Sequence, residues 1–450
     1  MSELLDLVPG CLVATIAAPG AAVVCVALIA LASRERTSER VALVLVGIAL
    51  AVSLAASAIV ALAASGLFGP GVEGEVDFGA WLSVGSYEVP AVLLVDTPAV
   101  VFSLLAAALT ALVARFSKTY LHREPGFVRF YVLLGMFAAG TQLVAFAGAL
   151  DLMFAGWELL GWSSALFIGF FHERAEPARS SVRAFTTYRI CDIGFLLAIV
   201  ATHELIGSTR IAALPAVALL PTSVTTAIAA MFLFSALGKS AQLPFSGWLP
   251  RAMEGPTPSS ALFYGGVSVH AGLYLLLRVW PMLEAAPAVE FVGVAIGLST
   301  AVYATLVART NSDAKGTLAH ATLAQVGLML AEICAGYREL ALLHLTGHAL
   351  LRVWQYLRAP NAIHDAHRIG HEHVVPSFLS SSRPHLAKRL YAAALHRWRL
   401  DERLDRAIAP VLGLARWIDV TERRLAAFVR AGDDSRTNDR RGQDPRGGAS

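Results

Sequence analysis

Ionisable side chains recur inside the apolar segments of this sequence, where they could carry protons. Glu158 lies in the middle of one apolar segment, Lys239 ends another, and later segments carry histidines. Burying an isolated charge at the centre of a bilayer costs roughly 3 kcal/mol, so an ionisable residue at that depth is a functional-site hypothesis. Lysine and histidine suit proton transfer because burial can bring their pKa values into the working range. The relay candidates are therefore Glu158, Lys239, His270, Lys315, His344 and His348.

Arg189 and Asp192 form a possible acid–base pair in the apolar segment that follows Glu158. They lie three residues apart, which places them on one face of a helix. The pair could share protons with Glu158, or it could be an ion pair that only joins two helices.

A purely structural interpretation applies to any one of these histidines. A single histidine in a helix, such as His270, is more often a packing residue with satisfied polar atoms. The succession of a glutamate, a lysine and several histidines over consecutive segments favours a chain of proton carriers instead. Tyr264, His320 and Arg352 are further candidates for that chain. Of these, Arg352 can set a local field but does not readily release its proton.

A helix break is predicted at Pro244, five residues after Lys239. Pro244 cannot donate a backbone hydrogen bond, and it therefore interrupts the helix that carries Lys239. A broken helix inside a membrane is tolerated only where protein or water satisfies the freed backbone groups. An ionisable residue beside such a break marks this stretch as the centre of the site.

Composition places the chain in a lipid bilayer. Its 450 residues are 56% hydrophobic, with a mean hydropathy of +0.60. Because runs long enough to cross a bilayer recur, the sequence predicts an all-α polytopic membrane protein with about eleven spans. The net charge of +3 is small, no nucleic-acid partner is expected, and the four cysteines show no spacing for a disulfide or a metal site. The spans lie near 9–33, 41–68, 97–116, 128–149, 152–171, 183–204, 224–246, 258–280, 288–308, 315–335 and 339–357.

Basic residues alternate between the connections of these spans. The first connection carries Arg34, Arg36 and Arg40, whereas the second, near 69–96, carries acids and no lysine or arginine. Because basic loops face the cytoplasm, the N-terminus is predicted outside and the C-terminus in the cytoplasm. The glycine-rich second connection is predicted to form an external hairpin.

The sequence changes character from residue 359. Four histidines, His364, His367, His371 and His373, follow in a polar stretch, but their spacing matches no closed zinc pattern. A solvated or partner-facing loop is expected there. Residues 386–429 have the pattern of amphipathic helices that lie on a membrane surface or against a partner. Residues 433–450 are almost without apolar side chains and are predicted to be disordered.

Taken together, these motifs resemble the antiporter-like proton-pumping subunits of respiratory complex I and of Mrp cation/proton antiporters. The resemblance covers about 95–358. It rests on 238–244 (GKSAQLP), with Trp248-Leu249 and Gly255-Pro256-Thr257-Pro258 after it. Further matches are Trp157-Glu158, Arg183-Ala184-Phe185 with Arg189 and Asp192, Gln325-Val326-Gly327, His344-Leu345 and His348-Ala349.

The resemblance implies an inverted repeat of five helices, each copy with a broken helix. Glu158 matches the family's essential glutamate, Lys239 its central lysine, and Arg189 with Asp192 the pair that modulates the glutamate. Lys315, His344 and His348 match the onward relay. The implied regions are 1–126 (N-terminal helices and external loop), 127–281 (first repeat), 282–358 (partial second repeat), 359–432 (histidine-rich loop and amphipathic cytoplasmic helices) and 433–450 (tail).

Three departures from the family pattern affect the proton path. The family's span-eight histidine falls at Tyr264, and His270 stands where lysine or threonine is usual. Arg352 stands where many members have lysine. The second repeat has three helices, and no counterpart of the second broken helix follows Arg358.

This shortened second repeat, with 348–360 and His364-Asp365-Ala366-His367, is most similar to the membrane subunit of the Dab inorganic-carbon accumulation complex. The resemblance implies a cation-conducting subunit, most simply for protons, in a bacterial inner membrane. It would couple an ion gradient to one-way CO2 hydration to bicarbonate. The chain itself would be no enzyme and hold no cofactor, because a cytoplasmic carbonic-anhydrase-like partner would carry the zinc.

Two alternatives remain open at this point. The chain could be a proton-pumping subunit of a complex I-like or hydrogenase redox complex, whose redox groups would lie in other chains. It could equally be an Mrp-type sodium/proton antiporter subunit.

Overall fold

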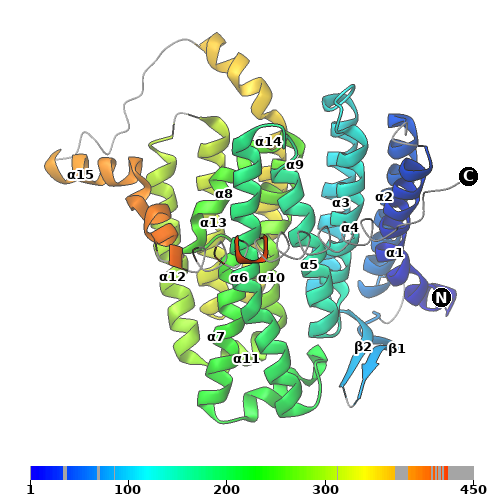
Figure 1. Ribbon diagram of the computed structural model, residues 1–450. Coiled ribbons are helices and arrows are strands. Elements are labelled where there is room, and N and C mark those ends of the chain that lie inside the picture. Colours follow the sequence, from blue (N-terminus) through cyan, green and yellow to red (C-terminus); the bar gives the residue numbers. More distant parts are fainter. Residues whose placement is uncertain are drawn as a thin grey trace, which may run out of the picture. The chain divides into compact units, whose positions relative to one another are not determined.

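The computed structural model describes residues 2–33, 38–67, 71–85, 87–311, 313–369 and 384–406, with a few positions between 409 and 423. The chain divides into two compact units, Met1–Leu395 and His396–Ser450. The first unit is a bundle of long helices with a β-hairpin at one end (Figure 1). This end is called the hairpin side below.

Nine helical segments of the described residues are long and apolar enough to cross a membrane. They are α1 (Ser2–Ala32), α2 (Glu39–Ala64), α3 (Thr97–Tyr120), α4 (Phe127–Phe146), α6 (Ala175–Ile206), α7 (Thr222–Lys239), the segment Thr257–Arg278, α12 (Pro287–Ala308) and α13 (Ala314–Cys334). The two other predicted spans correspond to α5 (Leu150–Ile168) and α14 (Arg338–Ile369), in which polar residues dilute the apolar character. The multi-pass, helical membrane fold is therefore confirmed.

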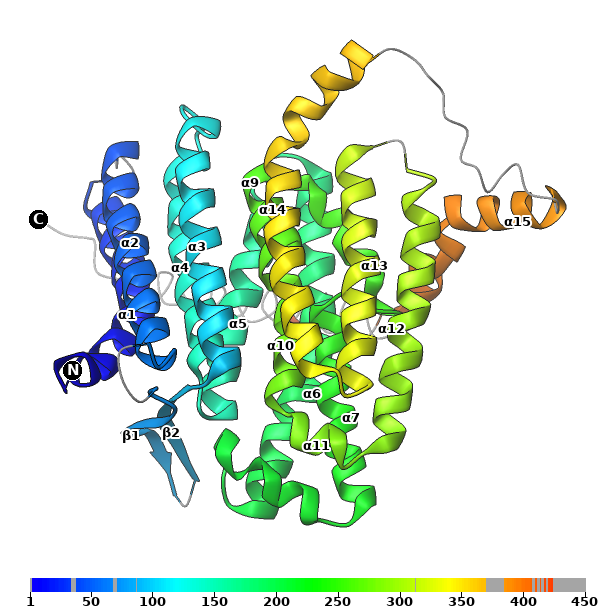
Figure 2. The same cartoon turned by 180° about the vertical axis from the view of Figure 1, so that it is seen from behind.

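Side-chain caps fix where several of these helices begin. The Asp96 carboxylate accepts a hydrogen bond from the backbone N–H of Ala99 at the start of α3 (3.0 Å). Asp313 does the same for Gly316 at the start of α13 (2.6 Å). Such caps satisfy backbone donors that a helix cannot satisfy itself. The two helices consequently have defined starts at opposite ends of the bundle (Figure 2).

Two helices are longer than the predicted spans. The predicted span began at residue 183, whereas α6 starts at Ala175. The predicted loop after residue 358 is wrong in its first part, because α14 continues to Ile369 and includes His364 and His367. Alanines at 359, 362 and 366 favour helix on both sides of Pro360. His371 and His373 lie outside the described residues.

The predicted hairpin is present. Strands β1 (Gly74–Val84) and β2 (Tyr87–Val95) pair antiparallel, with Gly74 opposite Val95 and Val84 opposite Tyr87. Its base is joined to two other loops by backbone hydrogen bonds. Gly148 N–H donates to the Val92 carbonyl (2.8 Å), and Ile211 N–H donates to the Gly148 carbonyl (2.8 Å). The hairpin is therefore fixed to the α4–α5 and α6–α7 connections.

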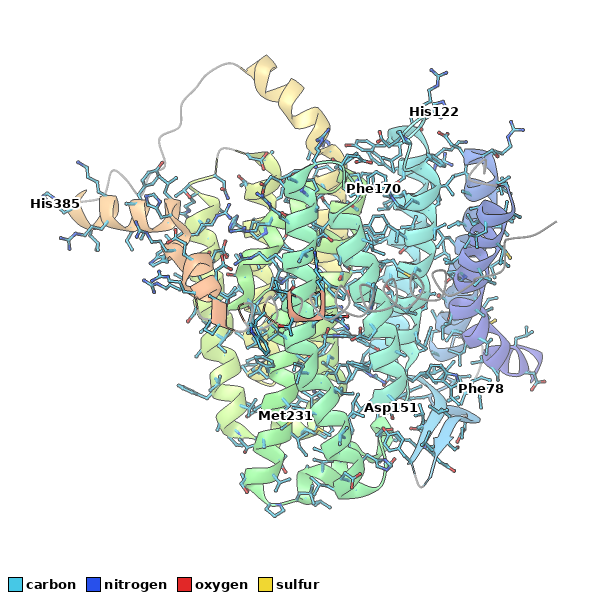
Figure 3. All side chains as sticks on the ribbon, in the orientation of Figure 1. Phe78, His122, Asp151, Phe170, Met231 and His385 are labelled. Carbon is cyan, nitrogen blue, oxygen red and sulfur yellow. The ribbon has the colours of Figure 1, made fainter. Side chains whose placement is uncertain are left out.

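Side chains add to this attachment. Arg210 donates to Glu75 (3.1 Å) and to Asp77 (2.5 Å), both on β1. Asp151, labelled in Figure 3 beside the hairpin, accepts hydrogen bonds from the hydroxyls of Tyr87 (2.5 Å) and Thr209. The hairpin is thereby tied to the first turn of α5, the helix that carries Glu158.

The C-terminal amphipathic region is confirmed in part. In the first unit, α15 (Pro384–Leu395) buries Ala387 and Ala394 and exposes Leu386 and Leu390. The helical pattern predicted over 386–429 is interrupted in the second unit, because the backbone at Arg397–Arg399 takes positive φ angles. Left-handed residues of this kind end a right-handed helix. The predicted tail, 433–450, lies outside the described residues.

The hairpin attachment should weaken in acid. The hydrogen bond from Arg210, with a second from the Gly79 N–H, holds the pKa of Asp77 below its ordinary value. A carboxyl with a depressed folded-state pKa stabilises the fold above its unfolded pKa, and that contribution is lost as the pH falls through the folded value. Amide hydrogen-exchange protection of residues 74–95 should therefore fall below about pH 4. Arg210→Gln should show the weaker protection already at pH 7, and equal protection at pH 3 and pH 7 would contradict this explanation.

Candidate functional site

The helix break after Lys239 begins earlier than the sequence predicted. Helix α7 ends at Lys239, and Ala241 turns the chain with a φ of +53°, three residues before Pro244. The prediction that Pro244 ends the helix is therefore wrong, although Pro244 does lie within the broken stretch. A short 3-10 turn, Phe245–Gly247, and the four-residue helix α8 (Trp248–Arg251) follow.

Other protein groups form hydrogen bonds with the backbone carbonyls that the helix break leaves unpaired. The Gln242 N–H donates to the Leu237 carbonyl (2.8 Å), and the Trp248 indole N–H donates to the Gly238 carbonyl (2.9 Å). A non-helical backbone at membrane depth requires such partners. The break is therefore a built feature, and it leaves Lys239 at the end of a fixed helix.

The Lys239 side chain is fully buried against aromatic rings. Its Nζ donates to the Trp157 carbonyl (3.1 Å) and lies 4.7 Å from the Trp157 ring centre and 5.0 Å from that of Tyr188. A cation held over aromatic faces is partly stabilised without a carboxylate partner. No carboxylate of the described residues forms a salt bridge with Lys239, so its proton is not committed to an ion pair.

Arg189 lies between the two carboxylates that the sequence singled out. One guanidinium nitrogen contacts Glu158 and the other donates to Asp192 (2.7 Å). Asp192 also accepts a hydrogen bond from the Trp157 indole (2.5 Å). The structure thus brings together Glu158, Arg189, Asp192 and Lys239, which we call the glutamate–lysine cluster. Its two acids and two bases balance, as buried charges require.

A glycine makes room for this cluster. A Cβ atom at Gly161 would lie 3.2 Å from Lys239 Nζ and 3.3 Å from the Arg189 guanidinium. Both cations therefore approach the same point on the backbone of α5. A larger residue would press on both.

The span after the break is not a regular helix. It consists of α9 (Thr257–Ser260), a π-helical segment Ala261–Gly266, a 3-10 turn Ser268–His270 and α10 (Ala271–Arg278). A Cβ atom at Gly265 would lie 2.8 Å from the Tyr356 ring of α14. The irregular segment therefore allows α14 to approach closely, and it aims His270 at that helix. Single-turn π segments are frequent at functional sites.

His270 and His348 form a buried pair. His270 Nε2 lies 3.1 Å from His348 Nδ1, and His270 Nδ1 lies 2.9 Å from the Gly266 carbonyl. On the other side of the pair, Arg352 Nε donates to His348 Nε2 (3.1 Å). These three bonds fit neutral rings in one arrangement, because the carbonyl only accepts and the guanidinium only donates. His348 Nδ1–H then donates to His270, and His270 Nδ1–H donates to Gly266.

His344 continues this line towards the end of α14. Its ring centre lies 6.4 Å from that of His348. Its Nδ1 lies 2.9 Å from a Glu332 oxygen of α13, and its Nε2 lies 2.9 Å from Gln325 Oε1. The structure therefore confirms that His344, His348 and Arg352 form one polar stripe, and it adds Glu332.

Tyr264, His320 and Lys315 have separate places. The Tyr264 ring packs against Trp248, with ring centres 5.9 Å apart, and its buried hydroxyl has no hydrogen-bond partner among the described residues. His320 Nδ1 lies close to the Gly316 carbonyl (2.8 Å) and the Asn311 amide (2.9 Å).

Lys315 lies in the first turn of α13, one residue after the start of that helix. It is ten residues from Gln325, or about 15 Å along the helix. Lys315 therefore lies far along α13 from Gln325, a residue that contacts His344.

Sequence reasoning missed three residues of the site. Trp157 and Tyr188 were overlooked because aromatic residues are ordinary in membrane helices, although here they surround Lys239. Glu332 could have been found by the rule that found Glu158, because it is an acid near the end of an apolar span. No group of three or more His, Cys, Asp or Glu side chains in the described ranges is placed to hold a metal ion.

The chain matches two family models. The model for NADH:quinone oxidoreductase/Mrp antiporter transmembrane regions matches residues 147–389, over half of the chain. The model for the N-terminus of NADH-ubiquinone oxidoreductase (complex I) chain 5 matches residues 81–131. The first match contains every residue of the glutamate–lysine cluster and of the α14 stripe.

Curated relatives agree with these matches. The chain is 31% identical over 303 residues to NAD(P)H-quinone oxidoreductase chain 5 of Synechocystis sp., covering 66% of this chain and 44% of that protein. It is 32% identical over 291 residues to NADH-quinone oxidoreductase subunit L of Mycobacterium tuberculosis, covering 64% of this chain and 46% of that protein. The chain thus spans less than half the length of these relatives.

Two solved structures share the fold. The Mrp complex from Dietzia sp. DQ12-45-1b superposes with a TM-score of 0.66 at 26% identity, covering 77% of this chain and 37% of that chain. The membrane-bound sulfane sulfur reductase, an archaeal respiratory membrane complex, gives a TM-score of 0.63 at 19% identity. The superposition covers 77% of this chain and 70% of that chain.

Gly161→Ala should disturb the Lys239 ammonium and the Arg189 guanidinium. The added methyl group would press on Lys239 and Arg189, and overpacking a tight site costs about 1–3 kcal/mol. Gly47→Ala is the matched control, because a Cβ atom there meets nothing within 4 Å. We expect the thermal midpoint of the purified protein to fall for Gly161→Ala and to stay near wild type for Gly47→Ala. Equal midpoints for the two variants would show that Gly161 is not tightly packed.

Proposed function

This chain belongs to the NADH:quinone oxidoreductase/Mrp antiporter transmembrane family, and we propose that it conducts protons across the membrane as one subunit of a larger complex. The observation that carries the proposal is the glutamate–lysine cluster beside a helix break, in which Lys239 and Asp192 are buried and Glu158 and Arg189 are partly buried. No structural need explains four charged side chains in one apolar bundle, because well-packed apolar residues of similar volume are often as stable.

Glu158 would be the first proton carrier. While it is ionised, Arg189 is shared between Glu158 and Asp192. Protonation of Glu158 removes one of the two negative charges, and Arg189 is then held by Asp192 alone. The Lys239 ammonium loses part of its attraction at the same moment, which favours release of its proton. In this way proton uptake at Glu158 and proton release at Lys239 are coupled electrostatically.

His270 would receive the proton that Lys239 releases. Buried polar atoms without a partner in the described part of the chain lie along this stretch, among them the hydroxyls of Ser240 and Tyr264. The Ser240 hydroxyl lies directly against α10, since a Cβ atom at Gly272 would be 2.4 Å from it. Buried polar atoms of this kind bind water. Water at Ser240 would connect the helix break with the His270–His348 pair.

The conducted ion is proposed to be the proton and not sodium. A hard cation such as sodium prefers several oxygen ligands. The oxygens of Asp192 are already engaged by Arg189 and Trp157, and one oxygen of Glu158 is engaged by Arg189. Of the carboxylate oxygens in the cluster, only Glu158 Oε1 has no partner in the described part of the chain, which is fewer than the several oxygens that sodium prefers.

The finer proposal concerns the partner. We propose that proton movement through this chain drives one-way CO2 hydration to bicarbonate by a cytoplasmic zinc-containing, carbonic-anhydrase-like subunit. Support comes from the sequence of 348–367 and from the order of the helices, since α15 and no second broken helix follows α14 in the described residues. The zinc would belong to the partner, and this chain would hold no cofactor. The complex would lie in a bacterial inner membrane, with the hairpin outside and α15 in the cytoplasm.

A redox complex or an antiporter fits the comparisons at least as well. The curated relatives carry the name of quinone oxidoreductase subunits, and one structural neighbour is an Mrp complex. In either case the proposed proton path through Glu158, Lys239 and His270 would be the same. Only the protein that drives, or is driven by, the proton movement would differ.

Glu158→Gln and Lys239→Ala should each stop proton conduction. Each variant removes a group that binds and releases the proton, and loss of such a group costs roughly 10²–10⁴-fold in rate. The measurement is proton flux into membrane vesicles that contain the full chain, driven by a potassium diffusion potential and followed with a pH-sensitive dye. Glu176→Gln, an exposed glutamate paired with Arg179, is the control and should keep the wild-type flux. Unchanged flux in both site variants would refute the proposed path.

Co-purification should identify the partner. The full chain, expressed with its neighbouring genes and extracted in mild detergent, is expected to carry a soluble protein with about one zinc per copy, as in a catalytic zinc site. Recovery of flavin or iron–sulfur proteins would instead indicate a redox pump. Recovery of several small membrane subunits without a metalloprotein would indicate an Mrp-type antiporter.

A further inference from the structure

Glu332 and His344 form an ion pair at the hairpin-side ends of α13 and α14. We propose that Glu332 is the last proton carrier of the path and exchanges protons between His344 and the water on the hairpin side. This inference rests on the proposed proton conduction. It gives the path an end within this chain, without a second broken helix.

The geometry of the pair suits proton transfer. His344 Nδ1 lies 2.9 and 3.1 Å from the two oxygens of Glu332, and His344 Nε2 lies 2.9 Å from Gln325 Oε1. Both ring nitrogens therefore face acceptor oxygens, as an imidazolium requires. His270 and His348 are buried, whereas the side chains of His344 and Glu332 are 23% and 22% exposed. Exposure thus rises along the line of carriers towards Glu332.

Glu332 lies close to one face of the membrane. It is two residues from Cys334, where α13 ends, which is about 3 Å along the helix axis. His344 is six residues into α14, or about 9 Å. The pair therefore lies near the α13–α14 turn.

Contacts place this turn on the hairpin side. The Arg338 guanidinium at the start of α14 stacks on Trp280 (5.4 Å), two residues after Arg278. Arg278 forms an ion pair with Asp96 (2.5 Å), the residue that follows β2. Figure 2 shows the same arrangement, with the α13–α14 turn and the hairpin at one end of the bundle.

Hydrogen-bond directions decide which way the proton leaves the buried pair. The Gly266 carbonyl cannot take up a proton, so a proton can leave His270 only through Nε2, and the His348 Nδ1–H that donates there must first turn away. His348 Nε2 faces Arg352, a donor that keeps its proton. The path along α14 is therefore blocked at Arg352, and the remaining titratable neighbour on the stripe is His344. The ring centres of His348 and His344 lie 6.4 Å apart, so a turn of the His348 ring and a bridging water would be needed to carry the proton across.

The last step balances in protons and charge. The N–H bond at His344 Nδ1 breaks and an O–H bond forms on Glu332, which leaves a neutral imidazole that still donates through Nε2 to Gln325. The protonated Glu332 then gives its proton to hairpin-side water and is ionised again. The same steps in reverse would admit a proton from that side.

The flux assay described above tests this inference separately from the proposed function. Glu332→Gln should lower proton flux by about tenfold or more, since it keeps the shape of the side chain and removes its proton exchange. Glu332→Asp should retain more flux than Glu332→Gln. Glu339→Gln is the matched control, because Glu339 is an exposed glutamate on the same face, 3.9 Å from Arg338, and it should keep wild-type flux.

The outcomes separate the two proposals. If Glu158→Gln stops the flux and Glu332→Gln does not, the end of the path is elsewhere and only this inference is overturned. If neither variant changes the flux, the proposed function itself fails.

Chemical labelling tests from which side of the membrane residue 332 can be reached, without a flux measurement. Glu332→Cys, in a chain whose Cys11, Cys25, Cys191 and Cys334 have been replaced, should react with a membrane-impermeant thiol reagent. The reaction should occur from the side that also labels Ser83→Cys, an exposed position on β1. Reaction from the opposite side, or no reaction, would overturn the assignment of Glu332 as the hairpin-side end.

Discussion

The contact of Arg189 with both Glu158 and Asp192 is the interaction on which the site depends. Two carboxylates in an apolar bundle would repel each other and would each lose their hydration. One planar guanidinium with several donors can satisfy both at once, which an ammonium cannot do in the same geometry. Lys239 is consequently left without a carboxylate partner and is stabilised by a carbonyl and two aromatic rings. A lysine held in this way can give up its proton more readily than one fixed in a salt bridge.

Irregular backbone brings the two polar clusters within reach of each other. Helix α7 ends at Lys239, and the π segment Ala261–Gly266 ends shortly before His270. Regular helices in both places would have satisfied all backbone groups internally and would have packed along their whole length. The breaks instead turn carbonyls such as those of Gly238 and Gly266 into acceptors for Trp248 and His270. The same irregularity therefore supplies hydrogen-bond partners for the Trp248 and His270 side chains.

The sequence predicts the spans and the first cluster well, because both depend on local patterns. Apolar run length places the helices, and a three-residue spacing places Arg189 beside Asp192. The end of α7 is not predictable in this way, since Ala241 adopts a left-handed conformation that only the surrounding packing enforces. Lys315 was assigned to the relay by resemblance, but its distance from His344 depends on where along α13 each residue falls. Glu332 acquires its role only through a contact between two helices.

Arg352 gives the histidine line its direction. A lysine at this position could accept and release protons, and a relay along α14 could then continue past it. An arginine keeps its proton, and its Nε–H holds His348 in the tautomer that faces His270. Its fixed positive charge also opposes a proton on His348, so a proton that reaches the pair is favoured to move on to His344, which has a carboxylate partner. An arginine at position 352, in place of a lysine, thus fits a path that ends at Glu332. It also explains why, within the stripe of His344, His348 and Arg352, the exchangeable groups lie on the hairpin side of Arg352.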